Sequence, residues 1–147
     1  MEAEIEKINH PESGNTHVAA HNKFSDYTRE EYRAMLGLKG MTPPAKSNNV
    51  HEAEEEFVPN GQTVNWVTKG NVWGVKDQGG CGSCWSFSTT GALQSAWSIK
   101  TGNAPPSLSE QQLVDCSHSY GNNGCQGGWY YYAWNYLADF VSEFDSY

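Results

Sequence analysis

The chain has 147 residues, a hydrophobic fraction of 37% and a formal net charge of -8 at pH 7. This length suits one domain of ordinary size, and the negative charge argues against a nucleic-acid partner, which would need a basic patch to neutralise phosphates. The sequence contains no run of about 18 apolar residues, so we expect no membrane-spanning helix.

The composition changes along the chain. All six tryptophans and all four cysteines follow Val64, whereas the first sixty residues are polar and poor in aromatic side chains. Between the two parts, residues 40–61 combine proline, glycine and asparagine with a run of glutamates. Such a stretch predicts an exposed linker, where proteases cut most readily.

One short helix is predicted in the first part. Thr28 is followed three residues later by Glu31, which is the pattern of a capping box. Gly37 suits the end of this helix, so we expect a helix over residues 29–36. The preceding stretch HNKFSDY, residues 21–27, is expected to be extended or turn-like.

Three helices are predicted in the second part. Apolar residues at helical spacing indicate a helix from Cys84 to Gly102. Ser109 is a candidate N-cap, with Gln112 three residues on, for a helix through EQQLVDC. A third helix should run through WYYYAWNYLADF. Strand signals are few, so we expect this part to be mostly helical.

Two groups of residues on these helices, one rich in hydroxyls and one aromatic, are expected to have structural rather than catalytic or binding roles. Residues 86–90 include four hydroxyl side chains without a nucleophile-elbow motif, and we expect them at the helix surface or in lobe contacts. The aromatic run 129–136 is expected to pack in the core, apart from its first two residues.

The four cysteines allow several interpretations. Cys81 and Cys84 form C-x-x-C, but the next pair, Cys116 and Cys125, is too widely spaced for a zinc knuckle. A thioredoxin-like redox site would need a βαβ pattern around the motif. Four structural disulfide cysteines in a secreted module would explain three of these residues but not the surroundings of Cys84.

A catalytic nucleophile explains the surroundings of Cys84 better. Its predicted place is a helix N-terminus, whose positive end stabilises a thiolate, the reactive form of cysteine. Acyl transfer also needs hydrogen-bond donors for the developing oxyanion. The Cys84 N–H and the Gln78 side chain are suitable donors, and the glycines between them allow a substrate to approach closely.

The pentapeptide Cys81-Gly82-Ser83-Cys84-Trp85 matches the papain and cathepsin signature. The chain resembles papain-like cysteine proteases of the cathepsin L-like branch over three blocks, residues 64–95, 107–116 and 121–137. The resemblance implies the α+β papain-like fold, of which residues 61–147 would form the mostly helical N-terminal lobe.

The first part resembles the end of an inhibitory propeptide. Residues 8–37 match the tail of its long helix, a G-x-N-x-F-x-D element and a last short helix. The element reads Asn22, Phe24 and Asp26, with Ala20 in place of glycine. We therefore expect propeptide at 1–40, and a linker with the maturation junction at 41–60, whose glutamates would weaken propeptide docking when acid protonates them.

The resemblance also implies residue roles. Cys84 would be the nucleophile that forms a thioester, Gln78 the oxyanion-hole side chain, and Cys81 the disulfide partner of Cys125. Trp129 and Tyr130 would line the S2 pocket and favour an apolar P2 side chain. The full set of implied substrate-binding residues is Gly82, Ser83, Trp85, Gly127, Gly128, Trp129 and Tyr130.

The resemblance further implies a hydrolase that is made as a zymogen and needs neither cofactor nor metal. Its partners would be peptide or protein substrates, its own propeptide and cystatin-like inhibitors, with no nucleic acid and no membrane. We expect a monomer. Disulfide use suggests an oxidising compartment, a lysosome-like vacuole or the extracellular space, although the acidic N-terminus lacks the features of a signal peptide.

The mechanism needs a base, which in this family is a histidine about 130–150 residues after the cysteine, with an asparagine that orients it. None of the five histidines fits, since three lie in the propeptide-like part, His51 in the linker and His118 in a polar loop. Cys116 resembles a cysteine that pairs with one further along. We therefore expect a truncated proenzyme fragment that is inactive alone.

Two other classes of function stay open. A chain with propeptide-like residues and no catalytic histidine suits an inhibitor or pseudoenzyme that binds papain-like proteases. A secreted, disulfide-bonded binding module would instead keep Cys84 oxidised or inert. Labelling Cys84 with an epoxide or iodoacetamide separates the second class from the protease interpretation.

Overall fold

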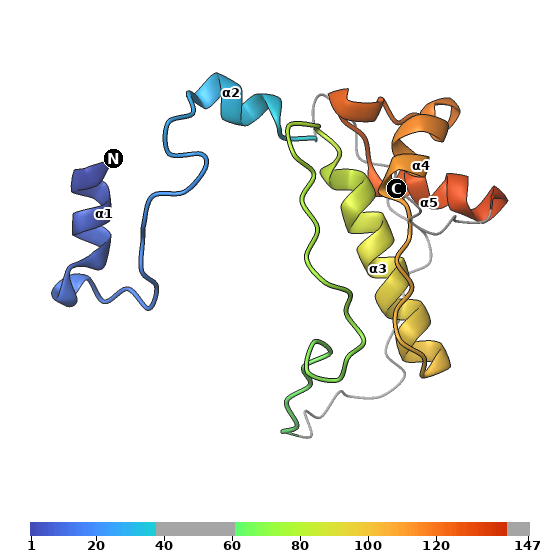
Figure 1. The fold of residues 1–147 in the computed structure, drawn as a ribbon, viewed down its shortest axis with the longest axis horizontal. Helices are drawn as coiled ribbons and strands as arrows, with labels where there is room; N and C mark the ends of the chain where they lie inside the picture. Colours follow the sequence, from blue (N-terminus) through green and yellow to red (C-terminus); the bar gives the residue numbers. More distant parts are fainter. Residues whose placement is uncertain (38–60, 141–147) are drawn as a thin grey trace. The chain divides into compact units, whose positions relative to one another are not determined.

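The computed structural model describes residues 1–37 and 61–140, which fall into two compact units (Figure 1). The first unit is Met1–Ala34 and the second begins at Met35. The expected linker and maturation junction at 41–60 lie outside the described residues. None of the described helices is long and apolar enough to cross a membrane.

The first unit holds two α-helices and a 3-10 turn. They are α1 (Glu2–Asn9), η1 (Pro11–Ser13) and α2 (Arg29–Ala34). No residue of this unit is buried. Its packing centres on Phe24, whose ring meets those of Tyr27 and Tyr32 edge to face, with ring centroids 5.6 Å apart in both pairs.

The capping box of α2 is confirmed. The Thr28 hydroxyl accepts a hydrogen bond from the Glu31 N–H at 3.2 Å, and the Glu31 carboxylate accepts from the Thr28 N–H at 2.7 Å. This backbone hydrogen bond, followed by one from the Thr28 hydroxyl, lowers the pKa of Glu31. The helix begins where the sequence predicts and ends at Ala34, slightly earlier than expected.

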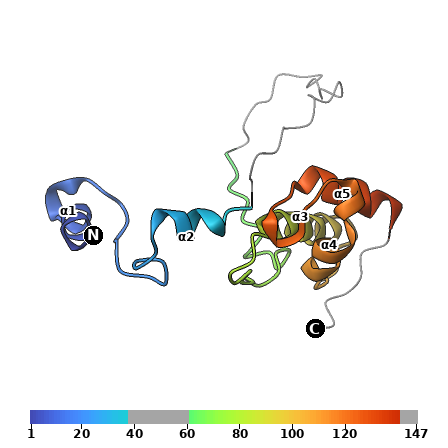
Figure 2. The ribbon, with the colours of Figure 1, turned by 90° about the horizontal axis from the view of Figure 1, so that it is seen from above.

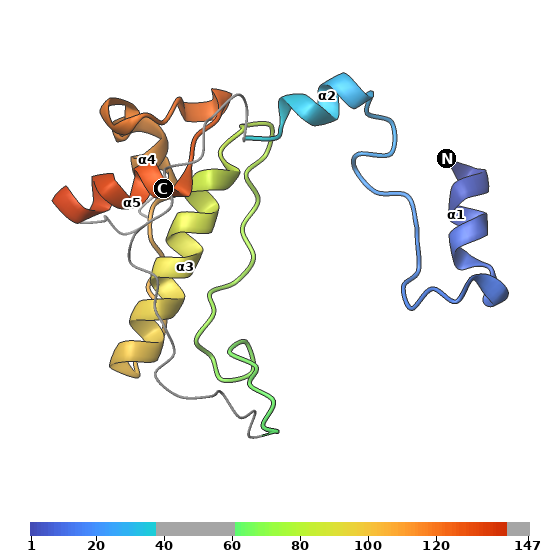
Figure 3. The same cartoon turned by 180° about the vertical axis from the view of Figure 1, so that it is seen from behind.

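The second unit is built on three helices. Its elements are α3 (Cys84–Thr101), α4 (Glu110–Cys116), η2 (His118–Tyr120), η3 (Gly124–Gln126) and α5 (Tyr130–Asp139). Figures 1, 2 and 3 show α4 and α5 beside α3. Among the described residues no extended strand occurs, and only Leu108 forms an isolated bridge. The mostly helical character that the sequence predicts is confirmed.

The core lies where the three helices meet. Trp85, Leu113, Ala133 and Tyr136 form one buried cluster, one or two residues from each helix. The helix starts follow the sequence signals, since α3 begins at Cys84 and the Ser109 hydroxyl accepts from the Gln112 N–H at 3.2 Å. The core therefore ties the first turn of α3 to α4 and α5.

The hydroxyl residues of α3 lie deeper than the sequence suggests. We expected them at the surface or in lobe contacts, but Ser86, Thr89 and Thr90 are completely buried within the unit. The Ser86 and Thr89 hydroxyls donate to carbonyls three or four residues back, as Thr89 does to Trp85 at 2.8 Å, while the Thr90 hydroxyl donates to Glu110 Oε1 at 2.7 Å. Because these bonds satisfy the hydroxyls within the unit, a polar helix face can be buried.

The aromatic residues of α5 are less buried than expected. Ala133 and Tyr136 face the core, but Tyr131 and Trp134 are 43% and 53% exposed. A helix of 3.6 residues per turn cannot turn every aromatic side chain inward. The expectation of core packing is therefore wrong for Tyr131 and Trp134.

Candidate active site

Cys84 is the first residue of α3 and carries a free thiol. It is half-buried. Its backbone N–H forms no hydrogen bond with a described residue, as is usual in the first turn of a helix. The thiol and an unused N–H donor therefore belong to one residue, at the positive end of the helix dipole.

A disulfide joins Cys81 to Cys125, with the two Cα atoms 4.7 Å apart. This is the pairing that the resemblance implies. The neighbouring Gly82 N–H donates to the Cys125 carbonyl at 3.0 Å. Cys116 is an exposed free cysteine. The described residues contain no group of histidine, cysteine and acidic side chains that could hold a metal ion.

The Gln78 carboxamide uses its two N–H groups on two carbonyls. Its Nε2 donates to the Cys81 carbonyl at 2.7 Å and reaches the Met35 carbonyl at 3.4 Å. The first bond holds the side chain against its own loop. The second shows that Gln78 faces a backbone carbonyl of Met35–Gly37, a segment distant in sequence.

Gly37 lies directly against Cys84. A Cβ atom added to Gly37 would be 2.8 Å from Cys84 Sγ and 2.5 Å from the Gly82 carbonyl oxygen, so only glycine fits without displacement. The Gly37 carbonyl accepts from the Gly128 N–H at 3.0 Å. A peptide backbone of the chain itself thus covers the thiol and contacts both Gln78 and Gly128.

Gly127 and Gly128 form a backbone strip opposite this segment. Gly127 is fixed through its carbonyl, which accepts from the Asn123 N–H at 2.8 Å. A Cβ atom at Gly128 would be 2.6 Å from the Trp85 indole. The indole therefore lies directly behind the strip, and Gly128 leaves its N–H pointing to the Gly37 carbonyl.

Asn122 supports the strip and was not predicted. Its side chain is buried, its Oδ1 accepts from the Trp129 N–H at 2.8 Å, and its Nδ2 donates to the Ser117 hydroxyl at 2.9 Å. The only sequence signal was its place within GNNGCQGG, where two asparagines adjoin glycines. The pattern could not tell the buried Asn122 from the exposed Asn123.

The remaining predicted site residues differ in exposure. Ser83 and Trp85 are only 2% exposed, so their side chains face the interior, and the Trp85 Nε1 donates to the Gly124 carbonyl at 3.3 Å. Trp129 is half-buried and its indole N–H has no partner among the described residues. Tyr130 is half exposed and packs edge to face on Trp129.

The propeptide-type element lies in the first unit. The Asn22 Oδ1 accepts from the Phe24 N–H at 2.8 Å, which closes a turn at the start of the aromatic group, and Asp26 is exposed. His118 is exposed in η2, and His51 lies outside the described residues. No described histidine forms a hydrogen bond with Cys84.

Comparison with known proteins assigns the family. The family model described as papain family cysteine protease matches residues 60–146. Digestive cysteine proteinase 2 of Homarus americanus is 48% identical over 119 residues, and the cathepsin L-like proteinase of Phaedon cochleariae is 42% identical over 131 residues. These matches cover 80% and 89% of this chain but 36% and 40% of the relatives.

A solved structure shows the same fold. The digestive procathepsin L 3 of Tenebrio molitor larval midgut matches with a TM-score of 0.70 and 36% identity, over 98% of this chain and 46% of that one. The helical second unit thus corresponds to the helical lobe of the papain-like fold, as the resemblance implied. The chain belongs to the papain family of cysteine proteases, and its relatives are cathepsin L-like.

Proposed function

We propose that the protein is a cysteine endopeptidase made as a zymogen, with Cys84 as its nucleophile. The observation that carries this proposal is the backbone of Met35–Gly37, which lies against Cys84 Sγ and hydrogen-bonds to both Gln78 and Gly128. A site that holds a peptide backbone over a free thiol suits the binding of a peptide substrate.

The proposed reaction follows from this arrangement. The Cys84 thiolate attacks a substrate carbonyl carbon, and the oxyanion that develops accepts hydrogen bonds from the Cys84 N–H and the Gln78 Nε2. The C–N bond then breaks, the amine leaves with the proton that the Cys84 thiol gave up on forming the thiolate, and a thioester remains on Cys84. Water hydrolyses the thioester, which releases the acid product and restores the thiol.

The described residues bring no histidine to Cys84, and the papain-like pattern places the base about 130–150 residues further along. The chain spans about 40% of the length of the curated relatives that it matches. The activity that we propose belongs to the whole enzyme. We expect the 147-residue polypeptide on its own to be inactive in peptide hydrolysis.

Substrate choice and compartment complete the proposal. Trp129 and Tyr130 follow the Gly127–Gly128 strip, and their rings suit an apolar P2 side chain. The Cys81–Cys125 disulfide supports an oxidising compartment, either a lysosome-like vacuole or the extracellular space. We propose peptide or protein substrates, a monomeric enzyme and inhibition by cystatin-like proteins.

The same observation supports a second candidate function. Because Met35–Gly37 fills the place proposed for a substrate, the propeptide-like residues suit an inhibitor of papain-like proteases. Adding the chain to an active cathepsin L-like enzyme tests this function. Inhibition that is lost on deletion of residues 1–37 supports it, and unchanged turnover rules it out.

The protease proposal is tested by the selectivity of two thiol reagents. Cys116 is an internal control because it is exposed and free. In the chain without residues 1–37, which lacks the segment that covers Cys84, we compare the ratio of the modification rates of Cys84 and Cys116 for the two reagents. We expect this ratio to be about tenfold higher for a peptidyl epoxide than for iodoacetamide, since the cleft binds the peptide part of the epoxide. Mass spectrometry of each cysteine gives the two ratios. Equal ratios for the two reagents would overturn the proposal.

A further inference from the structure

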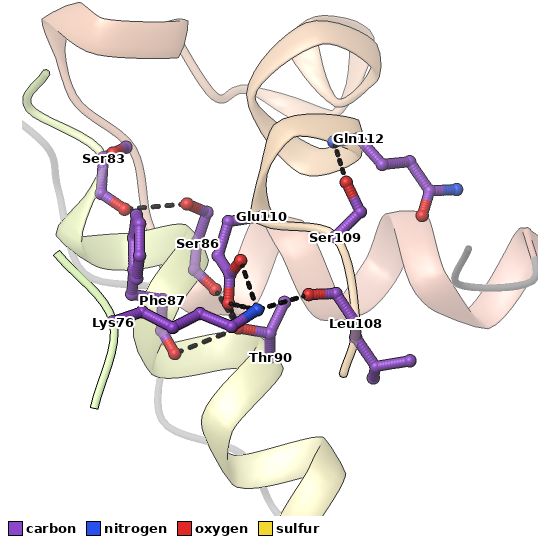
Figure 4. A network of polar contacts seen from close by, with 9 residues as sticks. All are labelled: Lys76, Ser83, Ser86, Phe87, Thr90, Leu108, Ser109, Glu110 and Gln112. Carbon is purple, nitrogen blue, oxygen red and sulfur yellow. Dashed lines mark hydrogen bonds and ion pairs between the residues drawn. The ribbon is translucent and has the colours of Figure 1, made fainter. Parts of the chain in front are cut away.

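A partly buried ion pair lies two residues before Gln78. The Lys76 Nζ contacts the two Glu110 carboxylate oxygens at 2.8 and 3.1 Å and donates to the Leu108 carbonyl at 2.9 Å (Figure 4). The Lys76 and Glu110 side chains are 21% and 12% exposed. The Lys76 ammonium group is therefore held between the Glu110 carboxylate and the Leu108 carbonyl.

Glu110 extends this connection to α3. It is the first residue of α4, and its Oε1 also accepts from the Thr90 hydroxyl at 2.7 Å (Figure 4). Thr90 is completely buried in α3, the helix that begins at Cys84. One carboxylate therefore joins the segment that carries Gln78 to the helix that carries Cys84.

Hydrogen bonds between backbone groups of the described residues do not fix the segment before Gln78. The backbone between Asn71 and Gly82 forms no backbone–backbone hydrogen bond with the described residues. The ion pair also lines a cavity of about 190 Å³, together with Trp73, Phe87 and Gln94. Because one side of the pair is not packed, hydrogen bonds do more than packing to set the position of Lys76.

Two anchors thus flank Gln78, the ion pair at Lys76 and the disulfide at Cys81. We propose that Lys76 and Glu110 are positioning residues that hold the Gln78 carboxamide in place relative to Cys84. This inference rests on the roles proposed for Cys84 and Gln78. A buried ion pair contributes little dependable stability, because desolvation offsets its attraction. The fixed geometry of the ion pair, in contrast, suits the positioning of Gln78 Nε2, a hydrogen-bond donor that must be preorganised for catalysis.

A double-mutant cycle on the 147-residue chain tests the inference. Its variants are the pair replacement, Lys76→Met with Glu110→Gln, the single change Gln78→Ala, and all three together. The readout is the rate at which iodoacetamide modifies Cys84, divided by the rate at Cys116. Gln78 holds the Met35 carbonyl, so a displaced Gln78 should release the segment that covers Cys84.

We expect the pair replacement and Gln78→Ala each to accelerate Cys84 modification by about three- to tenfold. The triple variant should be no faster than Gln78→Ala, since residues that act through one another are not additive. Two outcomes overturn the inference. One is an unchanged rate in the pair replacement while Gln78→Ala accelerates modification. The other is two accelerations that multiply in the triple variant.

Two controls separate positioning from a loss of fold. Methionine and glutamine keep the volumes of the replaced side chains, and a glutamine at position 110 still accepts from Thr90. Circular dichroism and the mass of the Cys81–Cys125 disulfide species should match the parent chain. Lys76→Arg keeps the charge and the donors, and we expect its rate to stay within about twofold of the parent.

If the pair replacement does not fold, Thr90→Val replaces it in the cycle. This change removes the Thr90 hydroxyl at nearly constant volume, and with it the 2.7 Å hydrogen bond to Glu110 and the longer contacts to the Ser86 and Phe87 carbonyls in the same helix. The inference is supported if Thr90→Val accelerates Cys84 modification less than the pair replacement should, and if this acceleration vanishes when Gln78→Ala is also present. It is overturned if iodoacetamide modifies Cys84 in Thr90→Val at the parent rate. The cycle uses no peptide reagent, so its failure is distinct from failure of the protease proposal.

Discussion

The Gly37 carbonyl accepts a hydrogen bond from the Gly128 N–H at 3.0 Å, while the Cα of Gly37 lies against the Cys84 thiol. The first contact uses a donor proposed for substrate binding, and the second covers the proposed nucleophile. Because both contacts involve one residue, a change at position 37 should alter access to Cys84.

The first prediction concerns Gly37→Ala. The added Cβ would lie 2.5 Å from the Gly82 carbonyl oxygen and 2.8 Å from Cys84 Sγ, so the segment must move away. We expect iodoacetamide to modify Cys84 at least about fivefold faster, because steric overlap of this size costs about 1–3 kcal/mol and each 1.4 kcal/mol is about a factor of ten. Peptide mapping by mass spectrometry gives the rate at Cys84.

Gly74→Ala is a matched control for Gly37→Ala. No atom lies within 4 Å of a Cβ added at Gly74, and the residue belongs to the same unit. It should leave the Cys84 rate unchanged. Parent-like protection of Cys84 in Gly37→Ala would show that Gly37 does not cover the thiol.

The second prediction concerns the disulfide. Cys81 and Cys125 are separated by 44 residues, so their bond restricts the unfolded chain strongly. Replacing both by serine should lower the free energy of unfolding by about 3–4 kcal/mol. Urea denaturation followed by tryptophan fluorescence measures the change.

Cys116→Ser serves as the control for the disulfide variant, because Cys116 is exposed and free. It should shift the urea midpoint very little. A double variant as stable as Cys116→Ser would mean that the bond adds nothing to the stability of the second unit.

The third prediction is a pH dependence in α2. Hydrogen bonds from Thr28 lower the pKa of Glu31 below its ordinary value of 4.5. The folded state therefore holds the ionised form more tightly than the unfolded state does. Its contribution to helix stability is complete above about pH 4.5 and is lost as the pH falls through the lower, folded pKa.

Amide NMR signals of α2 between pH 6 and pH 3 measure this effect. Glu31→Gln should remove most of the pH dependence of these signals. Glu30→Gln is the neighbouring control, because the Glu30 side chain forms no hydrogen bond with a described residue. If Glu31→Gln and the parent chain lose α2 signals over the same pH range, the capping box is not the acid-sensitive element.

The local features of this fold were predictable where a short pattern determines them. The pairs Thr28 with Glu31 and Ser109 with Gln112 mark helix starts through hydrogen bonds that span three residues. The start of α3 at Cys84 follows from the glycine-rich turn before it. Such signals need no knowledge of distant parts of the chain.

Features that depend on distant contacts were not predictable. The position of Gly37 against Cys84 joins residues that are far apart in sequence and that no periodicity connects. The burial of Thr89 depends on the hydrogen bond from its hydroxyl to the Trp85 carbonyl, which makes a polar face of α3 compatible with the core. The network of Lys76, Glu110 and Thr90 likewise appears only when three segments meet.

The fourth prediction concerns Asn122, which supports the Gly127–Gly128 strip. Asn122→Ala removes the acceptor of the Trp129 N–H and the donor to the Ser117 hydroxyl. Ser117 is buried and Trp129 is half-buried. An unsatisfied buried polar group costs about 1–3 kcal/mol, so the urea midpoint should fall. The strip should also shift, which weakens its hold on the Gly37 carbonyl and raises the rate of Cys84 modification.

Asn123→Ala is the control for Asn122→Ala. Asn123 is exposed, and its backbone N–H donates to the Gly127 carbonyl. Its side chain forms no hydrogen bond with a described residue. Removing its side chain should change neither the midpoint nor the Cys84 rate. If Asn122→Ala lowers stability but leaves the Cys84 rate at the parent value, Asn122 supports the core and not the strip. An unchanged midpoint would show that the buried amide is dispensable, because another group then satisfies the Trp129 N–H.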